Sequence, residues 1–134
     1  MKQILEHINV SVSSLSPTEV FLTSAFPDFQ RRGGGFAPGY GPWIHVGNEQ
    51  FYVSLTEVPQ RQAGGGFGHA GFVVEDLDAL MERLSQAGYQ PSLDTALNSH
   101  PWRRRIYYED GNGLEWEFVQ YLSDDVAQRN DYSH

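Results

Sequence analysis

The chain has 134 residues, of which 40% are hydrophobic, and a formal net charge of −8. This length suits one domain with a sizeable core, and the composition excludes a disordered chain. The sequence contains no cysteine, which excludes disulfides, thiolate metal sites and cysteine nucleophiles, so that nitrogen and oxygen atoms must bind any metal ion.

Charge and hydropathy also exclude two classes of partner. An acidic chain repels phosphate backbones, and the basic clusters at 31–32 and 103–105 are too short and too separate to form a nucleic-acid surface. No run of eighteen apolar residues is present, and the N-terminus lacks the apolar run of a signal peptide. We therefore expect a cytoplasmic protein that binds neither nucleic acid nor membrane.

The first predicted elements are a strand and a short helix. Residues 3–12 alternate between apolar and polar side chains, which is typical of a half-buried strand. Ser16 followed by Pro17 indicates a helix N-cap with proline in the first helical position, and this helix should end before Pro27.

A loop and a hairpin are predicted next. Residues 31–42 are rich in glycine and proline, which indicates a loop. Residues 43–46 and 50–58 then flank a turn and should form two antiparallel strands. The glycine-rich stretch 59–68 has the composition of a linker.

A similar order of elements follows the linker. Residues 69–75 indicate a strand, Asp76 an N-cap, and the apolar spacing of the next residues a helix that ends at Gly88. The turn sequence Asp-Gly-Asn-Gly at 110–113 should join strands at 104–109 and 114–121.

The chain is therefore expected to contain two similar modules within one domain. The first module spans about 3–58 and the second about 69–122, with the linker 59–68 between them. The tail 123–134 begins with an N-cap signal at Ser123 and should form a short helix.

Polar residues occupy matching places in the two modules. His7 and His69 each open the first strand of a module, and Ser54 and Glu117 follow them by 47 and 48 positions in the last strands. His7, His69 and Glu117 supply two imidazoles and one carboxylate, a set that suits a borderline divalent cation and leaves coordination positions free. Each residue alone has an ordinary explanation as a packed or solvated side chain. Their concordance favours a metal site.

Glycine-rich sequence does not indicate nucleotide binding here. Residues 66–71 match the string G-x-G-x-x-G, but the string enters a strand instead of opening a helix, and no P-loop lysine follows any glycine cluster. We therefore predict no nucleotide cofactor. No serine lies in a nucleophile elbow either.

The second module resembles the vicinal oxygen chelate superfamily, which includes glyoxalase I, fosfomycin-resistance enzymes, extradiol dioxygenases and bleomycin-resistance proteins. The resemblance rests on the histidine strand at 69–75, the helix up to Gly88 and the hairpin at 105–119. The family motif Asp-x-x-Gly-x-x-x-Glu, placed on Asp110 and Gly113, makes Glu117 the metal ligand, with Glu115 as the alternative in register.

This resemblance implies an α+β fold of two βαβββ modules that form a curved mixed sheet with the helices outside, and commonly a homodimer. His7 stands where the family has its first histidine, whereas Ser54 stands where a typical glyoxalase I has a glutamate. The implied set of two histidines and one glutamate is more similar to that of fosfomycin-resistance enzymes.

The function implied is that of a metal-dependent enzyme of the lyase or isomerase, thiol-transferase or dioxygenase type. Its divalent metal (Mn, Fe, Ni or Zn) would chelate two oxygens of a small substrate and act as a Lewis acid. The alternative is a metal-free drug-binding protein of the bleomycin-resistance type, which the acidity and the aromatic content favour. A weaker third possibility is a degenerate member that is regulatory or structural.

Other polar residues are weaker candidates. Glu115, Tyr52 and Tyr108 are possible pocket residues, although packing or solvation explains each more simply. Arg103–Arg105 would bind an anionic group or, more simply, protect an edge strand from aggregation. His100 is interpreted as an exposed loop histidine, with the pocket mouth as its alternative, and His45 as structural.

Overall fold

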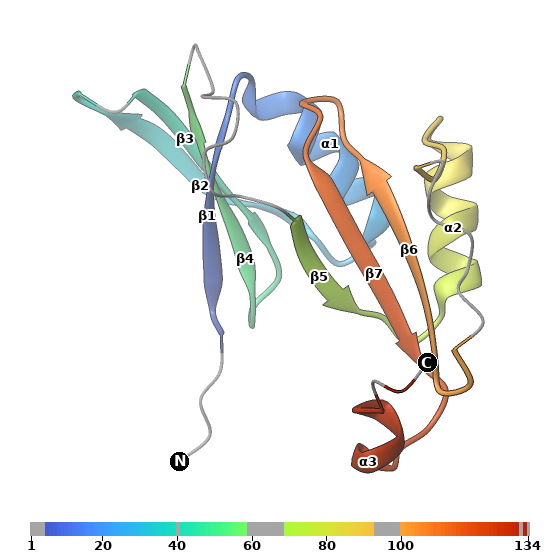
Figure 1. Cartoon of the computed structure of the whole chain (residues 1–134). Helices are drawn as coiled ribbons and strands as arrows, with labels where there is room; N and C mark the ends of the chain where they lie inside the picture. Colours follow the sequence, from blue (N-terminus) through green and yellow to red (C-terminus); the bar gives the residue numbers. More distant parts are fainter. Residues whose placement is uncertain (1–4, 40, 59–68, 93–99, 132, 134) are drawn as a thin grey trace. The chain divides into compact units, whose positions relative to one another are not determined.

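The computed structural model describes residues 5–39, 41–58, 69–92, 100–131 and 133 (Figure 1). The chain divides into two compact units, residues 1–67 and 68–134. Each unit contains its own mixed sheet and helices, which confirms the predicted α+β class. The linker predicted at 59–68 lies outside the described residues. No helix in the described part of the chain is both long and apolar enough to cross a membrane.

The first unit has the order strand, helix, three strands. Its sheet has the order β1-β4-β3-β2, with β1 parallel to β4 and the other neighbours antiparallel. The elements are β1 (His7–Val12), α1 (Leu15–Ala25), β2 (Gln30–Ala37), β3 (Gly41–Gly47) and β4 (Tyr52–Glu57).

Alternation along the strands separates a core face from a polar face in this unit. Paired residues in neighbouring strands lie on the same face of a sheet, so every second residue of β1, β3 and β4 joins the core. The buried side chains of this core come from those strands and from α1: Val10, Val12, Phe21, Leu22, Ala25, Ile44, Val46, Val53 and Leu55.

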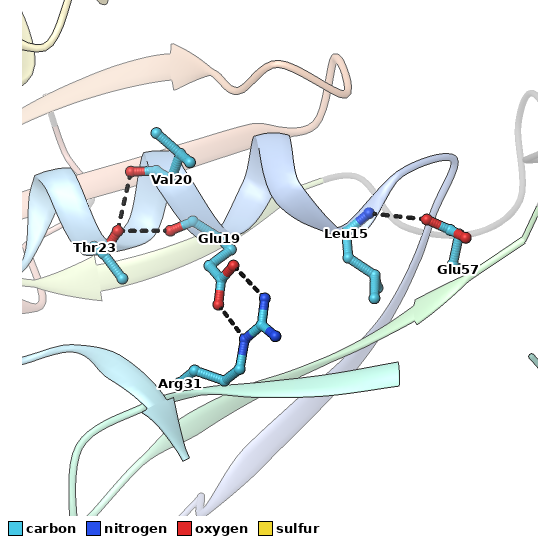
Figure 2. Close-up of polar contacts among 6 residues, drawn as sticks. All are labelled: Leu15, Glu19, Val20, Thr23, Arg31 and Glu57. Atoms are coloured by element: carbon cyan, nitrogen blue, oxygen red, sulfur yellow. Dashed lines mark hydrogen bonds and ion pairs between the residues drawn. The ribbon is translucent and has the colours of Figure 1, made fainter. Parts of the chain in front are cut away.

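Helix α1 begins two residues earlier than predicted. Its N-cap is Ser14, not Ser16, and the backbone N–H of Leu15 donates to the Glu57 carboxylate over 3.3 Å (Figure 2). The carboxylate that accepts from this amide belongs to a residue more than forty positions later in the sequence. Local sequence signals therefore do not reveal where the helix begins.

The prediction of a loop at 31–42 is wrong over most of this range. Residues Gln30–Ala37 form the exposed edge strand β2, paired with β3. Its glycines permit a close approach to that strand, since a Cβ on Gly34 would lie 3.0 Å from the carbonyl oxygen of Trp43. Backbone pairing with β3 therefore overrides the low strand propensity of glycine.

The second unit has a three-stranded sheet in the order β5-β7-β6, with β5 parallel and β6 antiparallel to β7. The elements are β5 (His69–Val73), α2 (Leu77–Gln86), β6 (Arg103–Glu109), β7 (Glu115–Tyr121) and α3 (Val126–Arg129). The described residues thus hold three strands of the four predicted, with an isolated antiparallel bridge between Pro91 and Tyr108.

Capping and turn signals in the second unit are confirmed. Asp76 caps α2 by accepting from the N–H of Ala79 over 3.0 Å, and Gly88 after the helix has φ +92°. The core of this unit is formed by buried apolar and aromatic side chains of α2 and of the β6–β7 hairpin: Leu77, Leu80, Leu84, Ile106, Tyr108, Leu114, Trp116 and Phe118.

The hairpin turn is organised by one buried carboxylate. Asp110 is 7% exposed, and its Oδ1 accepts from the N–H groups of Asn112 at 2.8 Å and Leu114 at 3.0 Å. Its Oδ2 accepts from the indole N–H of Trp116 at 3.0 Å. These bonds tie the turn to the core and fix the register of β7, because a slip by one residue would move Trp116 out of the core.

His100 corrects another prediction. It is 6% exposed, not an exposed loop residue. Its Nδ1 accepts from the N–H of Trp102 at 3.1 Å, so its Nε2 carries the proton and donates to the carbonyl of Asp131 at 2.9 Å. Arg103 also donates to the tail carbonyls of Arg129 and Asp131, both at 3.4 Å. The tail therefore covers His100 within the second unit.

Candidate metal centre

The polar face of the second sheet gathers one histidine and two glutamates. His69 on β5 pairs with Glu115 on β7, and Gly71 pairs with Glu117. All four positions are on the face opposite the core, because the intervening Phe72, Trp116 and Phe118 pack inward.

Glu117 is closer to His69 than Glu115 is. The Nε2 atom of His69 lies 3.0 Å from Oε2 of Glu117, whereas its Nδ1 atom lies 3.8 Å from Oε1 of Glu115. The Glu117 side chain is 14% exposed and that of Glu115 is 40% exposed. A Cβ on Gly71 would lie 3.5 Å from Oε2 of Glu117, so this glycine leaves the space beside the carboxylate open. The geometry favours Glu117 over Glu115 as the partner of His69.

Tyr107 also belongs to this face and was missed in the sequence. It pairs with Glu117 across the hairpin, its ring meets that of His69 edge-on at 5.3 Å, and its hydroxyl interacts electrostatically with the Glu117 carboxylate. Burial raises the pKa of Tyr107, and the negative charge of Glu117 raises the pKa further. The signal was present, because the turn at 110–113 sets a register that places Tyr107 opposite Glu117.

Tyr108, by contrast, is not at this site. It is 1% exposed and packs against Phe118 beneath α2, and this burial raises its pKa. Strand alternation directs it to the core face while its neighbour Tyr107 lies on the polar face.

The polar face of the first sheet carries a column of rings. His7 stacks on Tyr52 at 4.7 Å, and Tyr52 stacks on His45 at 4.5 Å. Nδ1 of His7 lies 2.8 Å from a carboxylate oxygen of Glu6, which leaves Nε2 as its free ring nitrogen. His45, for which the sequence predicts a structural role, thus shares this face with His7. Burial lowers the pKa of His45, and the positive charges of His7 and Arg32 lower it further.

Ser54 supplies no carboxylate to the polar face of the first unit. It is 8% exposed, and its hydroxyl accepts from the Asn9 amide at 3.0 Å. The same amide lies 3.4 Å from the hydroxyl of Thr56. These neutral groups satisfy one another and present no negative charge to a cation.

The structure therefore brings together two members of the predicted triad. His69 and Glu117 meet in the second unit, whereas His7 belongs to the first unit. Over the described ranges, no group of three or more His, Asp or Glu side chains suited to a metal ion is found. An imidazole nitrogen beside a carboxylate oxygen is nevertheless a donor pair that fits Mn, Fe, Ni or Zn, and the open side of Gly71 leaves this pair accessible.

Comparison with known proteins places the fold and the family. The sequence profile of the Glyoxalase/Bleomycin resistance protein/Dioxygenase superfamily matches residues 5–118, which is most of the chain. The chain belongs to this superfamily. Among curated proteins, none matches the sequence.

Solved structures of the glyoxalase superfamily have a similar fold. A glyoxylase/bleomycin resistance protein/dioxygenase domain from a Frankia species has a TM-score of 0.74 at 19% identity, covering 90% of this chain and 99% of that one. A genomically encoded fosfomycin resistance protein from Listeria monocytogenes has 0.69 at 18%, covering 96% and 97%. An antibiotic binding protein from a Streptomyces species has 0.66 at 19%, covering 90% and 97%. The relatives thus include both a resistance protein and a binding protein.

Proposed function

We propose that His7, His69 and Glu117 hold one divalent metal ion and that the protein is a metal-dependent enzyme acting on a small oxygenated molecule. The whole chain would then act as a single glyoxalase-like domain. The observation that carries the proposal is the 3.0 Å approach of His69 Nε2 to Glu117 Oε2 from adjacent strands.

The proposed metal ligands determine which chemistry the ion could support. Two imidazoles and one carboxylate leave coordination positions for two oxygens of a substrate, and the bound ion supplies Lewis-acid polarisation of those oxygens. The set suits Mn, Fe, Ni or Zn, and a reaction of the lyase or isomerase, thiol-transferase or dioxygenase type. Glu115, at 40% exposure and 3.8 Å from His69, is a candidate for proton transfer at the edge of the site.

The neighbouring side chains would orient the proposed ligands. The Tyr107 hydroxyl interacts electrostatically with the Glu117 carboxylate, and the ring of Tyr52 stacks on one face of His7. The Glu6 carboxylate beside Nδ1 of His7 favours the tautomer that leaves Nε2 free to bind a cation.

A metal-free binding protein is the second candidate, and one observation favours it. The aromatic column of the first unit, extended by Trp43 at 4.8 Å from His45, would suit contact with a flat drug-like molecule. The neutral Ser54 on the same face is consistent with this reading.

A metal titration discriminates between the two candidates. We would titrate Mn, Ni and Zn into metal-stripped protein by calorimetry and compare the single variants His7→Ala, His69→Ala and Glu117→Ala with the control Glu115→Ala. The proposal predicts that each of the three loses about tenfold or more in affinity while the control keeps its affinity. Unchanged affinity in His69→Ala and Glu117→Ala, with circular dichroism reporting a folded protein, would refute the site.

Assembly and location are expected from the same proposal. We expect a homodimer in the cytoplasm, as glyoxalase-type scaffolds commonly pair. Multi-angle light scattering of the purified chain would give twice the mass of 15.1 kDa if the expectation is right and the single mass if it is not.

A further inference from the structure

Two adjacent arginines of β2 have different surroundings. Arg31 donates from Nε and from a terminal nitrogen to the Glu19 carboxylate of α1, both at 2.6 Å, so its charge is neutralised on the helix side (Figure 2). Arg32 lies on the polar face instead, where its guanidinium carbon is 4.4 Å from the ring centroid of Tyr52. Successive side chains of a strand point to opposite faces of the sheet, and the register irregularity between Arg31 and Gly33 falls at Arg32.

The guanidinium of Arg32 keeps its hydrogen-bonding capacity. Within the described part of the chain, no carboxylate lies within ion-pair distance of Arg32. Contact with the Tyr52 ring uses the charge of the guanidinium and not its N–H donors, which form a planar fork suited to two acceptor oxygens. The ring also restricts the motion of the side chain, so less conformational entropy remains to be lost on binding.

The face around Arg32 is neutral or positive apart from one carboxylate. His7 and His45 both stack on Tyr52. The Asn9 amide and the Ser54 hydroxyl are neutral. Glu6 is engaged with His7. In a chain with a net charge of −8, this is a local site where an anion would be attracted.

We propose that the ligand of this protein carries a carboxylate or phosphate group and that Arg32 binds this group through two N–H donors on the polar face of the first unit. The inference deepens the proposed function by naming the charge of the ligand, and it rests on that function only for the statement that the ligand is a substrate. It concerns Arg32 and not the cluster 103–105 considered from the sequence, in which Arg103 binds the tail and Arg104 pairs with Asp78 at 2.8 Å.

The test uses metal-free full-length protein and probes that share a ring but differ in charge. Benzoate and phenyl phosphate carry the two anionic groups, benzamide is the neutral counterpart, and inorganic phosphate lacks the ring. Binding is measured by calorimetry, and NMR of the arginine Nε–H and histidine ring signals locates the site. We expect benzoate or phenyl phosphate to bind about tenfold or more tightly than benzamide and to shift the signals of Arg32, His7 and His45.

Arg31 provides a matched control, because Arg31→Gln and Arg32→Gln remove the same charge from neighbouring positions. Arg32→Gln should lower the anion affinity by about tenfold or more while Arg31→Gln changes it less than about twofold. Arg32→Lys, which keeps the charge but not the fork, should fall between Arg32→Gln and the unchanged protein.

Three outcomes would overturn the inference: equal losses in Arg31→Gln and Arg32→Gln, benzamide binding as tightly as benzoate, or no binding of any probe. Metal titration of Arg32→Gln separates this failure from that of the proposed function. Arg32→Gln should bind Mn, Ni or Zn as the unchanged protein does, since Arg32 is no part of the donor set.

Discussion

Three neighbouring residues constrain the side chain of Glu117. His69 approaches one carboxylate oxygen to 3.0 Å, the Tyr107 hydroxyl interacts electrostatically with the carboxylate, and Gly71 leaves the adjacent space open. Groups that orient a metal ligand contribute substantially to metal affinity. Tyr107 is therefore a positioning residue for the proposed centre.

Removing the Tyr107 hydroxyl should weaken metal binding without unfolding the protein. Tyr107→Phe keeps the ring against His69 but removes the hydroxyl that interacts with the Glu117 carboxylate, so we expect metal affinity to fall by about tenfold in calorimetric titration. Tyr108→Phe is the control, since Tyr108 lies in the core, and its metal affinity should not change. Equal affinities of Tyr107→Phe and the unchanged protein would contradict the positioning role.

A sequence motif can point to a single position, but strand pairing decides which side chains share a face. The motif singled out Glu117 but kept Glu115 open, and the choice depends on the side-chain distances to His69. The sequence points to Tyr108 as a candidate, whereas the hairpin register places Tyr107 on the polar face beside Glu117 and Tyr108 on the core face beside Trp116.

At the scale of elements, the hairpin β6–β7 depends on Asp110. Asp110→Ala removes the acceptor of three hydrogen bonds, all of them from buried or half-buried groups. We expect the free energy of unfolding in urea to fall by about 2–4 kcal/mol. Asp76→Ala removes one cap bond at the exposed start of α2 and should cost about 1 kcal/mol. A smaller loss in Asp110→Ala than in Asp76→Ala would contradict this ranking.

The edge strand β2 gives a second test at this scale. A methyl group on Gly34 would meet the Trp43 carbonyl and the Ile44 side chain at 3.0 Å, whereas one on Gly33 would meet nothing within 4 Å. Gly34→Ala should therefore destabilise the protein by about 1 kcal/mol in urea denaturation. Gly33→Ala should change stability by less than about 0.5 kcal/mol. Equal effects would mean that β2 does not approach β3 as described.

The elements differed in how far their sequence determined them. Helix α2, with its N-cap and the glycine after its C-terminus, was predictable because local hydrogen bonds and apolar spacing specify it. The β6–β7 hairpin was predictable from its turn residues for the same reason. Strand β2 was not, because its stability comes from pairing with β3 and not from its own residues. The start of α1 depends on Glu57, which is distant in the sequence.

At the scale of the whole molecule, the two units repeat one plan. Each has a mixed sheet, a helix against its apolar face and a polar face that carries the histidine of its first strand. Each also has a strand arginine paired with its helix, Arg31 with Glu19 and Arg104 with Asp78. The repeat of histidine strands was visible in the sequence, whereas the pairing of arginines was not.

The C-terminal tail adds stability to the second unit that the repeat does not supply. Removal of 123–134 would leave His100 and Arg103 without their bonds to Asp131 and Arg129. We expect a loss of about 1–2 kcal/mol in the free energy of unfolding, measured in urea. Removal of 132–134 alone keeps these bonds and should change little. Equal stability of the two truncated chains would contradict the role assigned to the tail.

The metal content of the purified protein tests the central claim most directly. The chain would be prepared without a histidine tag, analysed by elemental mass spectrometry, stripped, and analysed again after Mn, Fe, Ni and Zn are added back. The account predicts about one metal ion per chain, lost in His69→Ala and retained in Glu115→Ala. A folded protein that neither retains nor rebinds any of these metals would contradict the account and favour the metal-free binding protein.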